Sequence, residues 1–303
     1  MVNHRHCASC GRNLTQESYS RNQWSKHVGV SRCYSCVEGG NTNNTTTTTN
    51  RISQTARSNN ATNASFPNCN LENPFAEGGF RWVAKGSYTS GARNGESCVC
   101  KWFKTGHVLE ASFFSLDIKT TEKSLALVKE FNSRQFVNKI VMINIPEVWT
   151  FTSGSGSWAG KKVLQEPFIE NYVKFNSNSG WADGSTPWPR VMQALSHFSY
   201  HVSGGQFVLC DLQGGIYSNA VALTDPVILS RSKSYGVTDL GPRGISSFFS
   251  NHRCNEFCKG SWSKPADTTR YFTPQQGTSM MATGANRHVP TQRSRNRMPG
   301  IYE

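Results

Sequence analysis

Apolar residues repeat at helical spacing in two stretches of the chain and run continuously in two others. Between residues 122 and 136, Leu125, Val128 and Phe131 fall on one helical face. The same spacing recurs from residue 191 to residue 202 and ends before Gly204-Gly205, a typical helix stop. Residues 140–145 and 206–210 are short apolar runs typical of strands. Because these helices and strands follow no regular alternation, the pattern predicts an α+β fold.

The density of apolar residues also divides the chain into parts. Only 36% of the 303 residues are hydrophobic, below the roughly 45–50% of an ordinary globular domain. Residues 41–66, which include the run Thr45 to Thr49, have almost nothing to bury and predict a disordered linker. This linker separates a small module at residues 1–40 from a globular domain at residues 67–262. A basic, flexible tail is expected at residues 263–303.

Positive charge is concentrated outside the globular domain. The net charge is +13, and residues 1–40 contribute five basic and two acidic side chains to it. Residues 41–66 add two basic side chains, and residues 259–303 add seven basic and two acidic ones. An acidic partner or nucleic acid is therefore expected at the N-terminal module and the tail, because charge of one sign attracts such partners.

The sequence offers no signal for a membrane or for export. No run of about 18 apolar residues occurs, so the chain predicts no membrane-spanning helix and no membrane partner. The first residues, from Met1 to Cys7, do not resemble an apolar signal segment. We therefore expect an intracellular protein, cytoplasmic or nuclear, in which the ten cysteines stay reduced. Clustered cysteines then favour metal binding over disulfides.

Four cysteines in the N-terminal module have the spacing of a zinc site. Cys7 and Cys10 form one Cys-x-x-Cys pair, and Cys33 and Cys36 form a second after 22 residues. Two such pairs supply the four thiolates of a closed tetrahedral site. A redox-active cysteine pair is the alternative. A closed zinc site leaves no position for catalysis, so the predicted role of this module is to bind a partner.

A second group of metal-ligand residues lies near the end of the globular domain. His252, Cys254 and Cys258 occur within seven positions, and such a trio needs a fourth ligand. His197 and His201, on the helix expected at 191–202, are both candidates. Either histidine alone is more typical of a surface or hydrogen-bonded side chain.

The signatures of common phosphate-binding proteins are missing. Asp239-Leu240-Gly241 resembles the DFG triplet of ordinary protein kinases, but no HRD segment precedes it. The segment from Gly156 to Lys162 lacks both the spacing and the final hydroxyl of a phosphate loop, so it favours a hairpin turn.

Isolated polar residues in apolar surroundings nevertheless follow the order that a phosphotransferase requires. Lys101 lies within an apolar strand-like run, where a lysine is costly unless it meets an anion. Asp211 and Gln213 follow a buried strand, and Asp225 lies in a proline-containing turn. Each has an ordinary alternative, on a strand edge or in a turn. Together they supply a phosphate-binding lysine, magnesium ligands and a carboxylate that orients the acceptor hydroxyl.

Seven sequence blocks, in one order, carry a resemblance to a known family. They are Pro74–Arg81, Lys174–Gly180, Ala194–Phe198, Asp211–Gly214, Leu223–Pro226, Tyr235–Gly241 and Phe248–Cys258. In these blocks the chain resembles the alpha-kinases, atypical Ser/Thr protein kinases that include myosin heavy chain kinase and elongation factor 2 kinase. The resemblance covers about residues 73–258. It implies a two-lobed fold with a nucleotide cleft between the lobes, a structural zinc in the C-terminal lobe, and ATP- and Mg²⁺-dependent phosphorylation of protein substrates.

The resemblance also implies roles for residues of the nucleotide cleft. Lys101 would bind the nucleotide phosphates with Arg81 beside it, and Glu166 and Ile169 would meet adenine through backbone groups.

Further residues receive roles in phosphoryl transfer. Gln213 and Asp225 would hold magnesium, and Asp211 would orient or deprotonate the acceptor hydroxyl. How Asp211 and Asp225 divide the catalytic work stays open.

The remaining implied residues form a turn and a metal site. Gly236, Asp239 and Gly241 would form a glycine-rich turn on the acceptor side. The family selects His197 over His201 as the fourth zinc ligand, beside His252, Cys254 and Cys258.

One competing interpretation remains, in which the kinase-like domain is an inactive scaffold and the zinc module and tail bind nucleic acid or protein. Because Lys101, Asp211 and Asp225 are all competent residue types, the sequence favours activity. Autophosphorylation of the threonine-rich linker is a further hypothesis.

Overall fold

In this computed structural model, the polypeptide divides into two compact units, residues 1–49 and residues 50–303. The structure describes residues 4–8, 12–19, 21–27, 29–33, 59–104, 106–184, 186–277 and 279–282. Each unit has its own core.

The N-terminal unit is a small module built around two cysteines. Strands β1 (His4–His6) and β2 (Asn13–Thr15) pair antiparallel, followed by η1 (Gln16–Ser18) and α1 (Arg21–Trp24). Cys7, Tyr19 and Cys33 form a buried cluster against which Leu14 and Trp24 pack. So small a core contributes little stability by itself, which is why modules of this size usually need a metal or disulfides.

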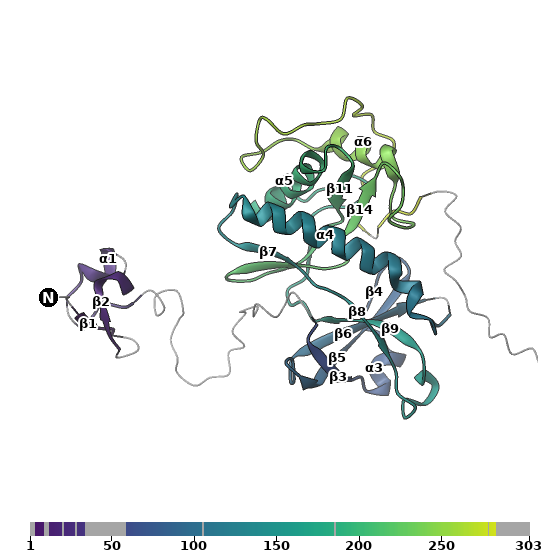
Figure 1. Cartoon of the computed structure of the whole chain (residues 1–303), viewed down its shortest axis with the longest axis horizontal. Helices are drawn as coiled ribbons and strands as arrows, with labels where there is room; N and C mark the ends of the chain where they lie inside the picture. Colours follow the sequence, from purple (N-terminus) through teal and green to yellow (C-terminus); the bar gives the residue numbers. More distant parts are fainter. Residues whose placement is uncertain are drawn as a thin grey trace, which may run out of the picture. The chain divides into compact units, whose positions relative to one another are not determined.

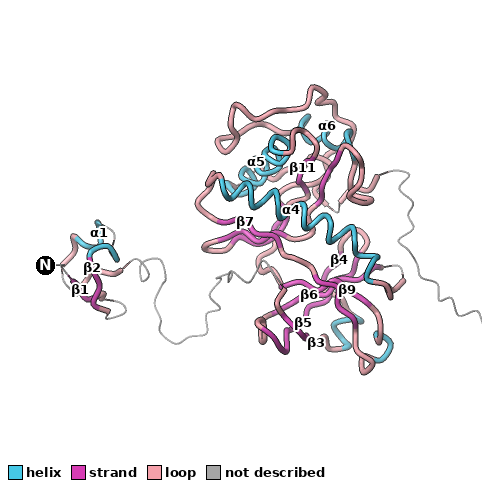
Figure 2. The backbone as a smooth tube through the Cα atoms, viewed as in Figure 1, coloured by secondary structure: helices cyan, strands magenta, loops and turns pink. Residues whose placement is uncertain are grey.

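The first lobe of the second unit is a six-stranded sheet, seen as the strand-rich end of the unit in Figures 1 and 2. The elements of this lobe are β3 (Ala61–Ser65), α3 (Asn68–Glu72), β4 (Ala76–Glu77), β5 (Arg81–Gly91), β6 (Ser97–Phe103), β8 (Glu147–Thr150), η4 (Gly156–Trp158) and β9 (Lys162–Pro167). The strand order is β3-β5-β6-β9-β8, and β4 pairs with the start of β5. As predicted, the segment forms a hairpin: residues 156–161 belong to the connection between β8 and β9, and Lys162 begins β9.

The second lobe combines helices with two small sheets. Its elements are η3 (Ala111–Phe114), α4 (Ser115–Ser133), β7 (Ile140–Ile143), β10 (Val173–Lys174), α5 (Pro187–Val202), β11 (Phe207–Cys210), β12 (Gln213–Ile216), β13 (Ala220–Leu223), β14 (Val227–Ser230) and α6 (Gly241–Asn251). One sheet has the order β10-β12-β13-β7 and the other pairs β11 with β14. Figure 1 shows α4 running along the sheets, with α5 and α6 at the far end of the lobe.

The apolar faces expected from the sequence form the core of this lobe. Leu127, Val128 and Phe131 of α4 are buried together with Val191 and Leu195 of α5. Helix α4 begins at Ser115, seven residues before the start expected from its apolar pattern. The apolar pattern missed this first part because the residues that α4 buries there include the polar Thr120, Thr121 and Ser124. Thr120 and Ser124 donate their hydroxyl hydrogens to backbone carbonyls four residues earlier, which removes the cost of their burial.

Two expected domain boundaries are wrong. Residues 61–65, assigned to a disordered linker, form strand β3 and pair with β5. The tail expected from residue 263 onward is bound to the second lobe as far as residue 282, excluding the undescribed Thr278: Tyr271 donates its backbone N–H to Ser247 Oγ, and Ala282 donates to the Val237 carbonyl. Both predictions relied on the polar composition of the segments. Backbone hydrogen bonds hold these segments in place, and amino-acid composition gives no information about such bonds. Residues 41–58 and 283–303 lie outside the described residues.

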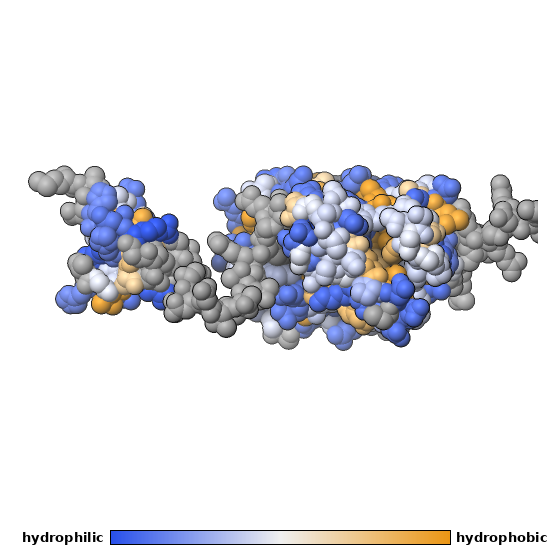
Figure 3. Space-filling model, turned by 90° about the horizontal axis from the view of Figure 1, so that it is seen from below, coloured by the Kyte–Doolittle hydropathy of each residue, from blue (hydrophilic) through white to orange (hydrophobic). Residues whose placement is uncertain are grey.

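The surface agrees with the low hydrophobic content of the sequence. Figure 3 shows a mainly hydrophilic face with local hydrophobic patches. Among the helices of the described residues, none combines the length and the apolar character needed to cross a bilayer.

Candidate active site

A buried lysine joins the two lobes of the second unit. Lys101, on β6, lies with its Nζ 2.8 Å from Glu166 Oε1 on β9 and 2.7 Å from Asp225 Oδ2 in the turn between β13 and β14. It also donates to Thr224 Oγ1 over 3.1 Å. The sequence predicted that this buried lysine meets an anion, and the structure shows two carboxylates beside it, one from each lobe.

Burial and charge act in opposite directions on these three groups. Burial alone would lower the pKa of Lys101, but the charges of Asp225 and Glu166 outweigh it and raise that pKa. Burial raises the pKa of Glu166, whereas the Lys101 ammonium holds the pKa of Asp225 below its ordinary value. The side chain of Glu166 is 2% exposed and that of Asp225 is 41% exposed, so Asp225 faces the open side.

Asp211 lies at the end of β11, where the sequence placed a ligand-facing carboxylate. It is fully buried, and its Oδ1 accepts a hydrogen bond from Lys174 Nζ over 2.8 Å. Lys174 also reaches Gln213 Oε1, at 3.3 Å. Asn176 supports the segment by accepting the Leu212 N–H. Lys174 thus links Asp211 to Gln213.

Both aspartates have an unusual backbone conformation. The φ angle is +57° at Asp211 and +47° at Asp225, in the left-handed region that aspartate tolerates better than most residues. Strained positions of this kind cluster at functional sites. Between them, Gly214 has φ +155°, and a Cβ there would lie 1.9 Å from the Ala222 carbonyl oxygen, so only glycine fits.

Arg81 lies at the start of β5, close to this group. It donates to Asp117 Oδ1 on α4 over 2.7 Å, and its charge helps to lower the pKa of Asp225. The Nε of Arg81 is buried without a hydrogen-bond partner among the described residues. An unsatisfied guanidinium nitrogen is suited to bind an anion such as phosphate.

The other two predicted cleft residues are Glu166 and Ile169. Glu166 belongs to β9, but its side chain binds Lys101, a role beyond the backbone contact with adenine that was expected. Ile169 is buried just after the strand, against the position of Gly215.

The glycine-rich turn is held together by Asp239. Gly236 and Gly241 have φ angles of +88° and +67°. The buried Asp239 carboxylate accepts hydrogen bonds from the N–H and hydroxyl of Ser230 and from the backbone N–H groups of Tyr235 and Gly241. All four bonds are internal, so Asp239 shapes the turn.

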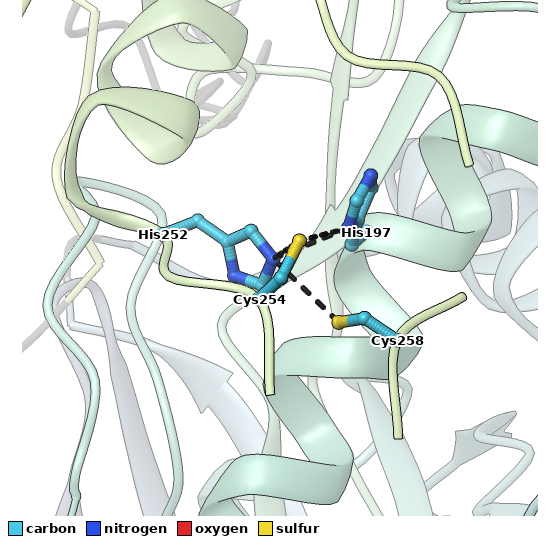
Figure 4. Close-up of side chains that lie close together, drawn as sticks. All are labelled: His197, His252, Cys254 and Cys258. Atoms are coloured by element: carbon cyan, nitrogen blue, oxygen red, sulfur yellow. Dashed lines mark hydrogen bonds between the residues drawn. The ribbon is translucent and has the colours of Figure 1, made fainter. Parts of the chain in front are cut away.

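Four metal-ligand side chains converge between α5 and the segment after α6 (Figure 4). They are His197, His252, Cys254 and Cys258, and their ligand atoms all lie within 4.8 Å of one another. His197 Nδ1 is 3.2 Å from His252 Nε2, and Cys254 Sγ is 3.7 Å and 3.8 Å from these two nitrogens. A tetrahedral zinc ion separates two nitrogen ligands by about 3.3 Å and a nitrogen from a sulfur by about 3.6 Å. The four residues therefore fit a zinc ion.

The other ring nitrogens of the two histidines are already paired. His197 Nε2 lies 3.1 Å from the Ser263 carbonyl oxygen, and His252 Nδ1 lies 3.3 Å from Gln193 Oε1. Such partners orient a histidine and leave its second nitrogen for the metal. His201 contacts Ser263, whereas His197 lies with the other three candidate ligands.

The predicted N-terminal zinc site is only partly within the described residues. Cys7 and Cys33 are buried together, and the Cys33 N–H lies 3.3 Å from Cys7 Sγ. Cys10 and Cys36 lie outside the described residues, so the four-cysteine site stays a prediction.

Comparison with known proteins identifies the class to which this arrangement belongs. Residues 76–258 match the Alpha-kinase family, so the chain belongs to that family. Alpha-protein kinase 1 of Dictyostelium discoideum is 33% identical over 193 residues, which cover 61% of this chain and 13% of that protein. The chain thus matches a small part of this relative.

Solved structures agree with the fold. An alpha kinase of Entamoeba histolytica superposes with a TM-score of 0.56 at 23% identity, covering 68% of this chain and 82% of that one. The alpha-kinase domain of myosin-II heavy chain kinase A in complex with AMP-PNP superposes with a TM-score of 0.52 at 24% identity, covering 61% and 83%. The two-lobed α+β kinase fold expected from the sequence is confirmed.

Several site residues were not singled out from the sequence. Lys174 appears only within the block Lys174–Gly180, and Thr224 and Asp117 received no role. Their partners are distant in the chain, and only the fact that Lys174 begins a recognised block could have drawn attention to it.

Proposed function

We propose that the chain transfers the γ-phosphoryl group of ATP to serine or threonine hydroxyls of a protein substrate. The observation that supports this proposal best is the position of Lys101, held between Glu166 and Asp225 with Asp211 in the same lobe as Asp225. A phosphate-binding lysine, a carboxylate for the metal and a carboxylate for the acceptor are the parts that phosphoryl transfer requires. A related kinase domain has been solved in complex with AMP-PNP, which supports nucleotide binding by this chain.

Nucleotide phosphates would meet Lys101 and Arg81. The three hydrogens of the Lys101 ammonium are donated to Glu166, Thr224 and Asp225. An incoming phosphate would therefore share this ammonium with those three side chains. The buried Nε of Arg81 offers a further donor. Adenine would lie against the strand end at Glu166 and Ile169.

Magnesium would be held by Gln213 and Asp225. Amide and carboxylate oxygens are the ligands that Mg²⁺ prefers, and both side chains present such an oxygen to a lysine ammonium. The bound ion would neutralise charge on the phosphates.

Asp211 would orient the acceptor hydroxyl and take its proton. Hydrogen-bond donors contact both oxygens of the Asp211 carboxylate, and one of these donors is the charged Lys174. The hydrogen bond from that ammonium holds the carboxylate in a fixed orientation. The half-exposed Asp225 would serve the metal, which gives the two aspartates separate tasks.

Zinc would have a structural role in both units. The cluster of His197, His252, Cys254 and Cys258 has four protein ligands and no open position, so it would tie α5 to the segment after α6. In the N-terminal unit, Cys7 and Cys33 would contribute two of four thiolates.

Radiolabel transfer from γ-labelled ATP to a basic protein such as a histone tests the activity. Asp211→Asn should lower the rate of transfer by a factor of about 10²–10⁴ while nucleotide binding remains, because only proton transfer and acceptor orientation are lost. Asp267→Asn, at an exposed aspartate, is the control and should transfer at the wild-type rate. Equal rates in wild type and Asp211→Asn would contradict the role given to Asp211.

The inactive-scaffold alternative is not favoured, since the phosphate-handling side chains meet in one place. An acidic or nucleic-acid partner for the N-terminal unit and the tail stays a prediction. An intracellular location also stays a proposal, for which the buried thiols Cys98, Cys100 and Cys210 are the support.

A further inference from the structure

The C-terminal segment 279–282 is bound directly against the proposed catalytic carboxylate. Ser279 Oγ donates a hydrogen bond to Asp211 Oδ2 over 2.5 Å. The other oxygen of Asp211 accepts from Lys174, so the serine occupies the remaining oxygen of a fully buried carboxylate. A hydroxyl at this distance from a general base has the geometry required of an acceptor.

The main chain of the segment is held by groups of the second lobe. The Asn178 side chain accepts the Met280 N–H over 2.9 Å and donates to the Met280 carbonyl over 2.7 Å. Ala282 donates its N–H to the Val237 carbonyl, within the glycine-rich turn, over 2.9 Å. Asn178 is itself buried and also donates to the Thr238 carbonyl. These contacts recognise an extended backbone whatever side chains it carries.

The side chains of the segment alternate between the core and solvent. Met280 and Ala282 pack against a buried cluster that includes Val208, Leu240 and Phe248. Met281, between them, is 47% exposed. Alternation with a period of two is the pattern of an extended peptide on a surface.

We propose that residues 279–282 occupy the acceptor-peptide site of the kinase, and that Ser279 is an intramolecular phosphate acceptor. This proposal rests on the proposed function. In the transfer, Ser279 Oγ forms a bond to the γ-phosphorus of ATP while the bond from that phosphorus to the β–γ bridging oxygen breaks. ADP leaves with the electron pair of the broken bond, and the serine proton passes to Asp211.

The same geometry defines a class of protein substrate. In an extended segment, the acceptor serine or threonine would be followed by an apolar residue one position later and by a small apolar residue three positions later. Protein substrates would then compete with the chain's own residues 279–282.

Hydrogen exchange tests the docking without nucleotide. In the wild-type full chain, the amides of Met280 and Ala282 should exchange slowly because both are donors to the second lobe. Met280→Asp should speed their exchange at least tenfold, since a carboxylate replaces a side chain packed on an apolar cluster. Met281→Asp makes the same charge change at the exposed neighbour and should leave both rates as in wild type. Equal exchange in all three proteins would overturn the proposal.

Steady-state kinetics test the competition. The acceptor is a synthetic peptide with the sequence of residues 274–284. Met280→Asp should lower the KM for this peptide about fivefold to tenfold and leave kcat within about twofold, because an internal competitor is released. Met281→Asp should match wild type. Met280→Ala repeats the test without a new charge, and an unchanged KM in both Met280 variants would overturn the proposal.

Phosphosite mapping tests the acceptor step. After incubation with ATP and Mg²⁺, Ser279 should carry phosphate at a rate independent of protein concentration, as an intramolecular reaction requires. Ser279→Ala should remove that phosphopeptide, and Ser261→Ala, at an exposed serine, should not. Transfer to the synthetic peptide with Ser279 unmodified overturns the acceptor role and leaves the proposed function standing. Failure of transfer to every acceptor overturns the proposed function and the proposal with it.

Discussion

The ammonium of Lys101 lies 2.7 Å from the carboxylate of Asp225, although 124 positions separate the two residues in the chain. Lys101 belongs to the sheet of the first lobe, and Asp225 to a turn of the second. Because Glu166 holds the same ammonium at 2.8 Å, one lysine both closes a buried ion-pair network and connects the lobes at the proposed nucleotide site.

Replacing this lysine should affect stability and activity together. Lys101→Met leaves the buried Glu166 carboxylate without its cation, so the free energy of unfolding should fall by about 3–5 kcal/mol. Phosphoryl transfer should fall by at least about a hundredfold, because a charge that stabilises the phosphates is lost. Urea unfolding and radiolabel transfer measure the two effects.

Lys104→Met is the matched control for Lys101→Met. Lys104 pairs with Glu77 at the surface, where ion pairs contribute about 0–1 kcal/mol. Its unfolding free energy should change by no more than that. A Lys101 variant as stable as the Lys104 variant would contradict the network described for Glu166 and Asp225.

Acid stability should depend on Asp225. Burial would raise the pKa of this carboxyl, but Lys101 outweighs it and holds the pKa below the ordinary value. Its contribution to stability is therefore complete above its unfolded pKa, about 3.9, and is lost as the pH falls through the lower folded pKa. Asp225→Asn should reduce the loss of unfolding free energy between about pH 4 and pH 2, measured by urea titration at each pH. Glu72→Gln, at an exposed carboxyl on α3, should keep the wild-type profile; an unchanged profile in Asp225→Asn would contradict the lowered pKa.

Metal content should separate the two zinc sites. Elemental analysis should find about two zinc ions per wild-type chain, one fewer in Cys258→Ser and one fewer in Cys7→Ser. Only Cys258→Ser should lower the melting temperature of the kinase domain, because the proposed zinc ion would join α5 to the segment after α6. His201→Gln changes the neighbouring histidine outside the cluster and should keep both ions. Loss of zinc in His201→Gln with retention in His197→Gln would reverse the ligand assignment.

Asp239 should prove structural. Asp239→Ala leaves four donors without their acceptor in the glycine-rich turn, so the free energy of unfolding should fall by about 3–5 kcal/mol. Asp267→Ala, at an exposed position, should change it by less than about 1 kcal/mol. An Asp239→Ala protein of wild-type stability without transferase activity would show instead that this carboxylate acts in the chemistry.

The sequence alone determined the class of fold and the family, and it grouped His252, Cys254 and Cys258 as candidate metal ligands. The spacing of apolar residues that indicates a helix or a strand can be seen within one element, as in the core-facing residues of α5. Ligand spacing also operates over a few positions, so His252, Cys254 and Cys258 could be grouped before any fold was known. Such signals are local, and a chain shows them without its tertiary structure.

Tertiary structure decided which residues meet. The ion pair between Lys101 and Glu166, the link from Lys174 to Asp211, and the Ser279 hydroxyl at the same aspartate all join residues far apart in the chain. Composition even predicted the wrong state for residues 61–65 and for residues 263–277 and 279–282, because polar segments become ordered when a folded surface offers backbone partners. Desolvation and charge at the lobe boundary, which set the pKa shifts of Lys101 and Asp225, likewise exist only after both lobes have come together.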